Sequence, residues 1–371
     1  MKVLYILQNL SADSGVTSIA MNIFRNTTKE KIQIDFLVCK RIVERETDFY
    51  NEIISNGGNV YYVGSPLGIR SFKKSLHNIK HFFKEHAHEY QAVHLHVPTI
   101  SYFTLKYAKH FNIPKRIIHS HSSMSSANKI KSFVNRILMG GKRYANVFWT
   151  CSPEAAEFLY GKKFLKKHSV EMIKNAVNVE VFNFNQDIRH SLRNELGFEN
   201  KKIITHISNF SPIKNVFFLL QVIQQIIEKD NDFIFLFIGD GPEKSEFENE
   251  TKNLGLEKNV KFMGRQSDIR KYLCASDLLL LPSLKEGLPV VTIEAQACGL
   301  PCLVNDTITK ECNVGLVDFL PLSAEIWIDK ICNFKFLTDN ERLKLSSAFK
   351  DNPYNVVNEA KRVEKLYFNL M

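Results

Sequence analysis

Short apolar runs alternate with amphipathic segments along the whole chain, and this alternation predicts the fold. Segment 69–85 shows the helical pattern well, because Phe72, Ile79 and Phe83 share one face and lysines occupy the other. Apolar runs too short for such helices lie before and after it, and these runs are typical of buried strands. The first half is predicted to hold, in order, strand 2–7, helix 15–25, strands 34–39 and 59–63, helix 69–85, and strands 92–96, 116–119 and 147–151.

The alternation stops over residues 178–186, where a polar stretch without periodicity predicts a linker. Alternation of strands and helices indicates parallel sheets with crossover helices. The expected fold class is therefore α/β, with two Rossmann-like doubly wound domains facing each other across a cleft. The expected domains are residues 1–180 and 181–352, followed by a helical segment, 353–371. The second half is predicted to hold strand 202–207, helix 216–228, strand 233–238, a helix from 243, strands 260–263, 278–281 and 302–304, and helix 356–370.

Composition agrees with a globular protein of more than one domain. A length of 371 residues fits about two domains, and contents of 44% hydrophobic and 24% charged residues are ordinary. The seven cysteines form no C-x-x-C pair and no histidine spacing matches them, which favours reduced thiols and no metal site. The apolar run 3–7 is too short for a signal peptide, and no run is long enough to span a membrane. The sequence therefore predicts a cytoplasmic protein.

The net charge of +10 is distributed unevenly along the chain. Residues 70–170 contain eighteen Lys or Arg against four Asp or Glu, a local excess of +14. Such an excess favours an acidic partner, and three candidates are nucleic acid, an anionic membrane and a phosphate-bearing acceptor. The alternative is a basic surface that is only solvated and binds no partner. Nucleic acid fits least well, because no nucleic-acid-binding motif appears. Segment 129–143 mixes apolar and basic residues, as expected of a segment on a bilayer surface.

Two carboxylates, Glu286 and Glu294, stand eight positions apart on either side of a Gly-Leu-Pro step. An apolar run precedes them, so Glu286 is expected on a strand-to-helix loop and Glu294 inside the helix. Pro289 suits the first helical position, and the amides of a helix N-terminus bind anions. A diphosphate at the amides, with sugar and ribose hydroxyls donating to the carboxylates, would fit a sugar nucleotide. The spacing alone fits two surface glutamates at a helix start equally well.

With its flanking residues, segment 282–300 resembles the E-x7-E signature of retaining glycosyltransferases of the GT-B fold, in the large family four that builds bacterial polysaccharides. The spacing, the Gly-Leu-Pro step and the preceding Pro-Ser agree together. The resemblance extends over nearly the whole chain and is strongest over residues 202–309. It implies that the last helix returns to the first domain.

The same resemblance implies an activity, partners and a location. The expected reaction is metal-independent transfer from a nucleotide-sugar donor, expected to be UDP-linked, without a further cofactor. The expected acceptor is a lipid-linked saccharide in capsule, exopolysaccharide or O-antigen assembly. The enzyme would then act in the cytoplasm, peripherally on the inner face of the plasma membrane, where its basic segment meets an anionic surface.

The resemblance also assigns roles to individual residues. Glu286 would fix the donor sugar, Glu294 would hold the ribose, and Lys214 would stabilise the leaving diphosphate. The family usually has an arginine where this chain has Asn209, so another base such as Arg265 would have to compensate. The donor-binding residues implied in addition are Gly15, Asn209, Gly239, Arg265, Gly287, Leu288, Pro289 and Val290.

Histidines occur in two pairs that end predicted strands, VHLH and IHSH. His121 is followed by two serines and best resembles the family's histidine that contacts the transferred sugar, and His119 comes second. A histidine at a strand end is otherwise a packed core residue, and this interpretation is favoured for His94 and His96.

Two other classes of function remain open. A sugar-nucleotide epimerase of the GT-B fold would use the same nucleotide site without an acceptor, and products formed from donor alone would identify it. A weakened nucleotide-sugar-binding partner subunit is suggested by Asn209. Donor binding without turnover would identify that class.

Overall fold

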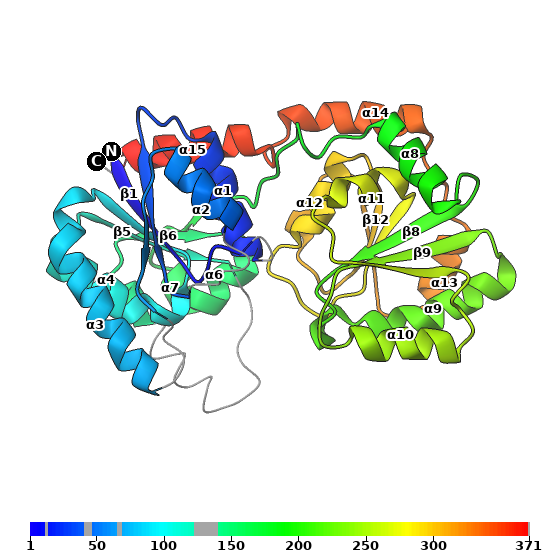
Figure 1. Ribbon diagram of the computed structural model, residues 1–371, viewed down its shortest axis with the longest axis horizontal. Coiled ribbons are helices and arrows are strands. Elements are labelled where there is room, and N and C mark those ends of the chain that lie inside the picture. Colours follow the sequence, from blue (N-terminus) through cyan, green and yellow to red (C-terminus); the bar gives the residue numbers. More distant parts are fainter. Residues whose placement is uncertain (12–13, 41–46, 65–68, 122–139, 370–371) are drawn as a thin grey trace. The chain divides into compact units, whose positions relative to one another are not determined.

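The computed structural model describes residues 1–11, 14–40, 47–64, 69–121 and 140–369. The chain divides into two compact units (Figure 1). The N-terminal unit consists of Met1–Ala176 together with Val356–Met371, and the C-terminal unit is Val177–Asn355. The last helix therefore belongs to the unit that begins the chain.

The N-terminal unit is built on a seven-stranded sheet in the order β3-β2-β1-β4-β5-β6-β7, and every neighbouring pair of these strands is parallel. The order reverses between β1 and β4, as it does in a doubly wound fold. The strands are β1 (Lys2–Leu7), β2 (Gln33–Val38), β3 (Val60–Tyr62), β4 (Ala92–Leu95), β5 (Lys115–Ser120), β6 (Val147–Thr150) and β7 (Glu171–Met172).

Helices cover both faces of this sheet because alternate residues of each strand point to opposite sides. Leu4 and Ile6 pack with α3 (Ile69–His86), α4 (Ser101–His110) and α6 (Pro153–Tyr160). Tyr5 points to the other face, where α1 (Gly15–Asn26) and α15 (Val356–Asn369) lie side by side (Figure 1). The remaining helices are α2 (Thr47–Ser55), α7 (Lys162–Leu165), η1 (Ala87–Glu89), η2 (Pro98–Ile100) and η3 (Gly140–Arg143).

The C-terminal unit repeats this topology. Its six-stranded sheet has the order β10-β9-β8-β11-β12-β13, again with parallel neighbours. The order reverses between β8 and β11. The strands are β8 (Lys202–Ile207), β9 (Phe233–Ile238), β10 (Val260–Gly264), β11 (Leu278–Leu281), β12 (Cys302–Asn305) and β13 (Val317–Leu320).

Both faces of β9 are buried, so its sequence is apolar throughout rather than alternating. Its three phenylalanines pack toward α9 (Val216–Lys229), α10 (Lys244–Asn253) and α13 (Ala324–Cys332). Its aliphatic residues pack toward α8 (Gln186–Leu196) and α11 (Ile269–Ala275) (Figure 1). The remaining helices are α12 (Val290–Ala297), α14 (Asp339–Ala348), η4 (Pro212–Lys214), η5 (Lys310–Cys312) and η6 (Phe349–Asp351).

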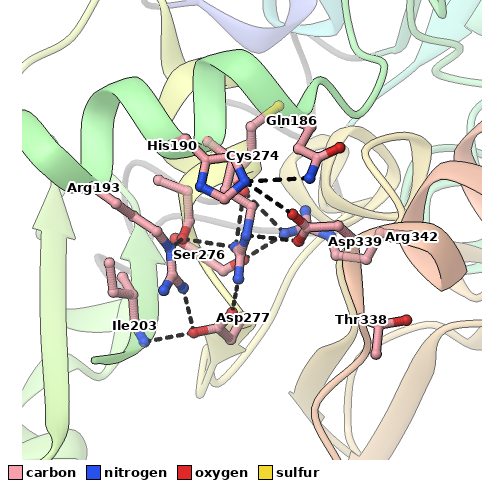
Figure 2. Close-up of polar contacts among 12 residues, drawn as sticks. Gln186, His190, Arg193, Ile203, Cys274, Ser276, Asp277, Thr338, Asp339 and Arg342 are labelled. Atoms are coloured by element: carbon pink, nitrogen blue, oxygen red, sulfur yellow. Dashed lines mark hydrogen bonds and ion pairs between the residues drawn. The ribbon is translucent and has the colours of Figure 1, made fainter. Parts of the chain in front are cut away.

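A buried ion cluster fixes the amino edge of the C-terminal sheet (Figure 2). Asp277 accepts hydrogen bonds of 2.6 Å from Arg189 and from Arg193 of α8, and one of 2.8 Å from the backbone of Ile203. Arg342 of α14 donates to four backbone carbonyl oxygens, including those of α11. The carboxylate of Asp277 is thus saturated by protein donors, and the cluster ties three helices to the sheet.

The α/β fold class with two Rossmann-like domains is confirmed, and the predicted strands and helices are found in the predicted order. The structure adds elements that the sequence analysis did not predict, among them strands β7 and β13 and helices α4, α6, α8, α11, α13 and α14. The edge strand β13 alternates between buried Val317 and exposed Asp318, and it lacks the continuous apolar run of the buried strands. Residues 129–139 of the predicted bilayer segment and residue 370 of the predicted last helix lie outside the described ranges.

Candidate active site

In the C-terminal unit, the strand order reverses between β8 and β11, and the carboxyl ends of these strands are a candidate ligand site. Parallel strands β8 and β11 are neighbours, and the loops that follow them leave the sheet at the same edge. In doubly wound folds, ligands bind outside the carboxyl ends of the strands at such a switch point. The two loops are residues 208–215 after β8 and residues 282–289 after β11.

The first loop is anchored by His206, near the end of β8. Its Nδ1 donates to the Leu280 carbonyl of β11 over 3.0 Å, and its Nε2 accepts from the Ser208 hydroxyl over 2.7 Å. Burial and, to a smaller extent, the positive charge of Lys214 lower the pKa of His206 to about 4, although its hydrogen bond with the Leu280 carbonyl acts in the opposite direction. The imidazole is therefore neutral at pH 7 and holds the start of the loop in one position.

The turn after β9 packs against the backbone of the same loop. A Cβ atom added at Gly239 would lie 1.8 Å from the Ser208 carbonyl oxygen, and one added at Gly241 would lie 1.8 Å from that of Asn209. The φ angle of Gly239 is +128°, a conformation that favours glycine. The sequence analysis assigned Gly239 to donor binding, and the structure shows close approach of the chain's own backbone at this residue.

The two loops meet in an ion pair between Lys214 and Glu286. Lys214 Nζ lies 2.5 Å from Glu286 Oε1, and the two side chains are 19% and 15% exposed. Backbone contacts reinforce the junction, because the Leu284 amide donates to the Ile213 carbonyl over 2.8 Å and Asn215 Nδ2 to the Pro282 carbonyl over 3.3 Å. A cation and a carboxylate predicted to serve one ligand thus lie side by side at the switch point.

Glu294 lies in α12, which begins one residue later than predicted. Pro289 has extended backbone angles and is the N-cap, so Val290 is the first helical residue. Burial raises the pKa of the Glu294 carboxyl to about 7. Among the described residues, no side-chain hydrogen bond or ion pair to Glu294 is found. Its carboxyl group is therefore a candidate acceptor for a ligand's hydroxyl groups.

All the predicted donor residues of the C-terminal unit follow the carboxyl ends of its strands. Asn209 is exposed, and its Oδ1 accepts from the Ser211 hydroxyl over 2.9 Å. Arg265 is exposed just after β10, on the same edge. The full set after β8, β9, β10 and β11 is Asn209, Lys214, Gly239, Arg265, Glu286, Gly287, Leu288, Pro289, Val290 and Glu294.

Gly15, His119 and His121 lie in the N-terminal unit. Gly15 is the exposed first residue of α1, and an added Cβ there would meet no atom within 4 Å of the described chain. Its neighbour Ser14 caps the helix by accepting from the Thr17 amide over 3.3 Å. The fold therefore does not need a glycine at residue 15.

The structure brings the two histidine pairs together at the ends of β4 and β5. His96 Nδ1 lies 2.8 Å from His121 Nε2, and His94 Nε2 lies 3.1 Å from His119 Nδ1. His94 Nδ1 contacts the Tyr367 hydroxyl of α15 over 2.6 Å. Burial lowers the pKa of His121 to about 3 and the pKa values of the other three well below the usual range. All four rings are neutral at pH 7.

Residues 188–313 match the protein family described as glycosyl transferases group 1. The chain is also 31% identical over 340 residues to EpsF of Bacillus subtilis (strain 168), to which glycosyltransferase activity is ascribed. That match covers 89% of this chain and 86% of EpsF. The chain belongs to this glycosyltransferase family.

Other relatives of this glycosyltransferase carry more specific names. It is 24% identical over 381 residues to the UDP-Gal:alpha-D-GlcNAc-diphosphoundecaprenol alpha-1,3-galactosyltransferase of Escherichia coli, over 96% of this chain and 94% of that one. It is 28% identical over 317 residues to the capsular polysaccharide biosynthesis glycosyltransferase CapH of Staphylococcus aureus, over 78% and 81% of the two chains.

Among solved structures, Anabaena Alr3699/HepE in complex with UDP matches the glycosyltransferase with a TM-score of 0.78 at 18% identity, over 100% of both chains. HepE has also been solved in complex with UDP-glucose. The likeness shows that the GT-B fold extends over the whole chain. In the described ranges of the glycosyltransferase, no helix is both long and apolar enough to cross a membrane.

Some residues of the glycosyltransferase that shape this edge were not predicted. His206 and Ser208 hold the loop of Lys214, and Gly241 supports it, but no charge or motif distinguishes them in the sequence. The sequence analysis placed both histidine pairs at strand ends, but it did not predict the contacts of His94 and His96 with His119 and His121. Two pairs with the same spacing at the ends of consecutive predicted strands were the signal that could have revealed it.

Proposed function

We propose that this glycosyltransferase transfers a sugar from a UDP-linked donor to a lipid-linked saccharide in bacterial surface polysaccharide assembly. Transfer retains the anomeric configuration and uses no catalytic metal. The observation that carries this proposal is the Lys214–Glu286 pair at the switch point, with Glu294 following in α12. HepE, which is 18% identical to this chain, has been solved in complex with UDP and with UDP-glucose. The Escherichia coli relative is named for a UDP-sugar and a diphosphoundecaprenol acceptor. These names support the donor and acceptor classes.

Donor binding is proposed to exchange one ion pair for another. The diphosphate carries more negative charge than Glu286 and competes with it for Lys214, which lies near the end of the loop after β8. The amides at the start of α12 donate to the same phosphates. Glu286, released from Lys214, accepts hydrogen bonds from hydroxyl groups of the donor sugar, and Glu294 accepts those of the ribose.

Lys214 and the α12 amides then stabilise the charge that develops on the leaving diphosphate, which is the role a metal ion has in other transferases. Asn209 contributes no charge, so Arg265 or Lys285, both exposed on the same edge, is proposed to supply the missing cation. The resemblance further assigns His121 to the transferred sugar, with His119 beside it.

Product analysis tests this proposal directly. Purified enzyme is incubated with UDP-, GDP- and ADP-sugars and a diphospholipid-linked saccharide, and the anomeric configuration of the product is read by NMR. We expect a new glycosidic bond from a UDP-sugar with retained configuration, and unchanged activity in EDTA. An epimerised donor without an acceptor, donor binding without turnover, or activity that EDTA abolishes and Mg²⁺ or Mn²⁺ restores would contradict the proposal.

A further inference from the structure

The face of the N-terminal sheet beneath α15 carries three buried histidines in one place. In the parallel register of β4 and β5, His94 aligns with Ile117 and Leu95 with Ile118, which brings His96 beside His119. The three side chains point to one face because they are two residues apart in each strand or aligned across strands. One ring nitrogen from each of His94, His96 and His119 lies within 4.8 Å of the other two.

From this geometry we propose that His94, His96 and His119 bind a divalent transition-metal ion of the kind that imidazole prefers, with Zn²⁺ as the reference ion. Zn²⁺ binds histidine nitrogens at about 2.0–2.1 Å, and three histidines with one further position form a familiar zinc site. His94 Nε2 and His119 Nδ1 are already 3.1 Å apart, close to the separation of two ligands on one tetrahedral ion.

The hydrogen bonds around the cluster leave nitrogen lone pairs for such an ion. Tyr367 donates to the Tyr5 hydroxyl over 3.1 Å, so its oxygen can accept the Nδ1 proton of His94. His94 Nε2 then accepts a hydrogen bond from His119 Nδ1, and a metal takes the place of this proton when His119 carries its proton on Nε2 instead. Tyr367 takes the position of the oxygen partner that orients a metal-bound histidine. His96 offers Nε2, because its Nδ1 pairs with His121.

Unsatisfied buried nitrogens provide an independent indication. His96 Nε2 and His119 Nε2 are buried and have no hydrogen-bond partner among the described residues, and the two residues are only 2% and 0% exposed. Buried polar atoms are nearly always partnered, and an ion is one established explanation for an exception. A metal at the cluster would give His96 Nε2 the partner that it lacks.

The chemistry of the three donor atoms indicates which metals would bind. A set made only of imidazole nitrogens suits Zn²⁺, Cu²⁺, Ni²⁺ and Co²⁺ and is a poor site for Mg²⁺ or Ca²⁺. The site is therefore distinct from the charge stabilisation that Lys214 is proposed to give, and it goes beyond the proposed function.

The experiment measures metal binding to the full chain after chelator treatment, without nucleotide. Exposed His77 and His81, one turn apart on α3 with ring centroids 6.3 Å apart, form a competing surface pair. All titrations therefore use a His77→Gln/His81→Gln background. We expect one equivalent of Zn²⁺ by calorimetry, a tetrahedral visible spectrum with Co²⁺, and a rise of the thermal midpoint with Zn²⁺ but not with Mg²⁺.

Variants identify the ligands. His96→Gln and His119→Gln should each weaken Zn²⁺ binding at least tenfold, and Tyr367→Phe, which keeps the ring but removes the oxygen, should weaken it about tenfold. His110→Gln, an exposed residue outside the cluster, is the matched control and should change nothing. Circular dichroism verifies that each variant is folded, and Tyr367→Phe serves if the histidine variants unfold.

Two results would overturn the proposal. One is the lack of stoichiometric Zn²⁺ binding and of a tetrahedral Co²⁺ spectrum in the background chain. The other is binding that folded His96→Gln, His119→Gln and Tyr367→Phe chains retain unchanged. Neither result bears on the proposed transfer reaction, because the titrations contain no nucleotide and measure no transfer.

Discussion

At the scale of single residues, Lys214 and Glu286 neutralise each other at the centre of the candidate site. Their side chains are mostly buried, so separating them has a free-energy cost that donor binding must offset. The pair also keeps Lys214 in position without the side-chain entropy loss that a free lysine would suffer on binding. Glu286 therefore opposes donor binding through Lys214 and is proposed to assist turnover through the sugar.

This double role predicts that Glu286 and Glu294 differ in their effects on binding. Glu286→Gln should leave UDP affinity unchanged or higher, because Lys214 becomes available to the diphosphate, and should lower kcat. Glu294→Gln should weaken UDP binding by about 1.5–3 kcal/mol, the contribution of a charged hydrogen-bond acceptor. Calorimetry with UDP and steady-state kinetics measure the two effects. Weaker UDP binding by Glu286→Gln with normal binding by Glu294→Gln would reverse the assignment.

The raised pKa of Glu294, about 7, predicts pH-dependent donor binding. The ribose hydroxyls donate hydrogen bonds to the ionised form of Glu294. Below pH 7 the carboxyl group is mostly protonated, so it must lose its proton before the ribose binds. Affinity for UDP-glucose should therefore fall as pH drops below 7, by up to tenfold per pH unit. For stability the sign is opposite, since burial of the ionised form disfavours folding as pH rises from 4.5 through 7. Glu294→Gln is the control, and its affinity should not change with pH.

The family resemblance implies an arginine at the position of Asn209, whose side chain is exposed. Asn209→Arg should strengthen UDP binding by about 1 kcal/mol, a modest gain because a solvated ion pair contributes little. Asn209→Ala, which removes the contact with Ser211 but adds no charge, is the control. Weaker binding by the arginine variant alone would mean that another cation already occupies that position.

At the scale of elements, the loop after β8 packs directly on the turn after β9, because Gly239 and Gly241 lie against the loop backbone. Gly239→Ala should displace the loop that carries Lys214, cost about 1–3 kcal/mol of stability and weaken UDP binding. Gly140→Ala is the matched control, since among the described residues its added Cβ would meet only the Tyr102 ring, at an ordinary contact distance of 3.4 Å. Denaturant unfolding and calorimetry measure both quantities. Unchanged UDP binding by Gly239→Ala would show that the loop does not depend on this support.

Strand ends could be predicted from the sequence because hydrophobic alternation is a local property. Every predicted donor residue of the C-terminal unit consequently lies at the carboxyl edge of its sheet. The contact of Lys214 with Glu286 could not be predicted, because it depends on β8 and β11 being neighbours although β9 and β10 lie between them in the chain. The contacts between the two histidine pairs could not be predicted for the same reason, since the register of β4 and β5 creates them. Strand order and register depend on packing between distant segments.

At the scale of the whole molecule, the excess of basic residues in segment 70–170 predicts binding to an anionic membrane. Lysines near such a surface contribute about 1 kcal/mol each, and salt screens the effect. Binding to vesicles containing phosphatidylserine should therefore disappear at high salt. Charge reversal of three exposed α3 lysines, Lys73, Lys74 and Lys80, should weaken co-sedimentation at least tenfold.

The control for this experiment applies the same change of charge to the C-terminal unit, at exposed Lys229, Lys252 and Lys258. Equal effects of the two triple variants would attribute binding to net charge rather than to the N-terminal unit. Equal binding to neutral and anionic vesicles at low salt would mean that the basic residues are only a solvated surface.

Helix α15 has a consequence for how the protein is made. Its side chains at Val356, Ala360, Val363 and Tyr367 are buried in the N-terminal unit, and Tyr367 contacts Tyr5. Domains usually fold in the order in which the ribosome releases them. Here helix α15, which is synthesised after the whole C-terminal unit, completes a core to which strand β1 belongs. The C-terminal unit can therefore finish folding on the ribosome before the N-terminal unit does, and a nascent chain that ends at residue 355 leaves the earlier unit without this helix.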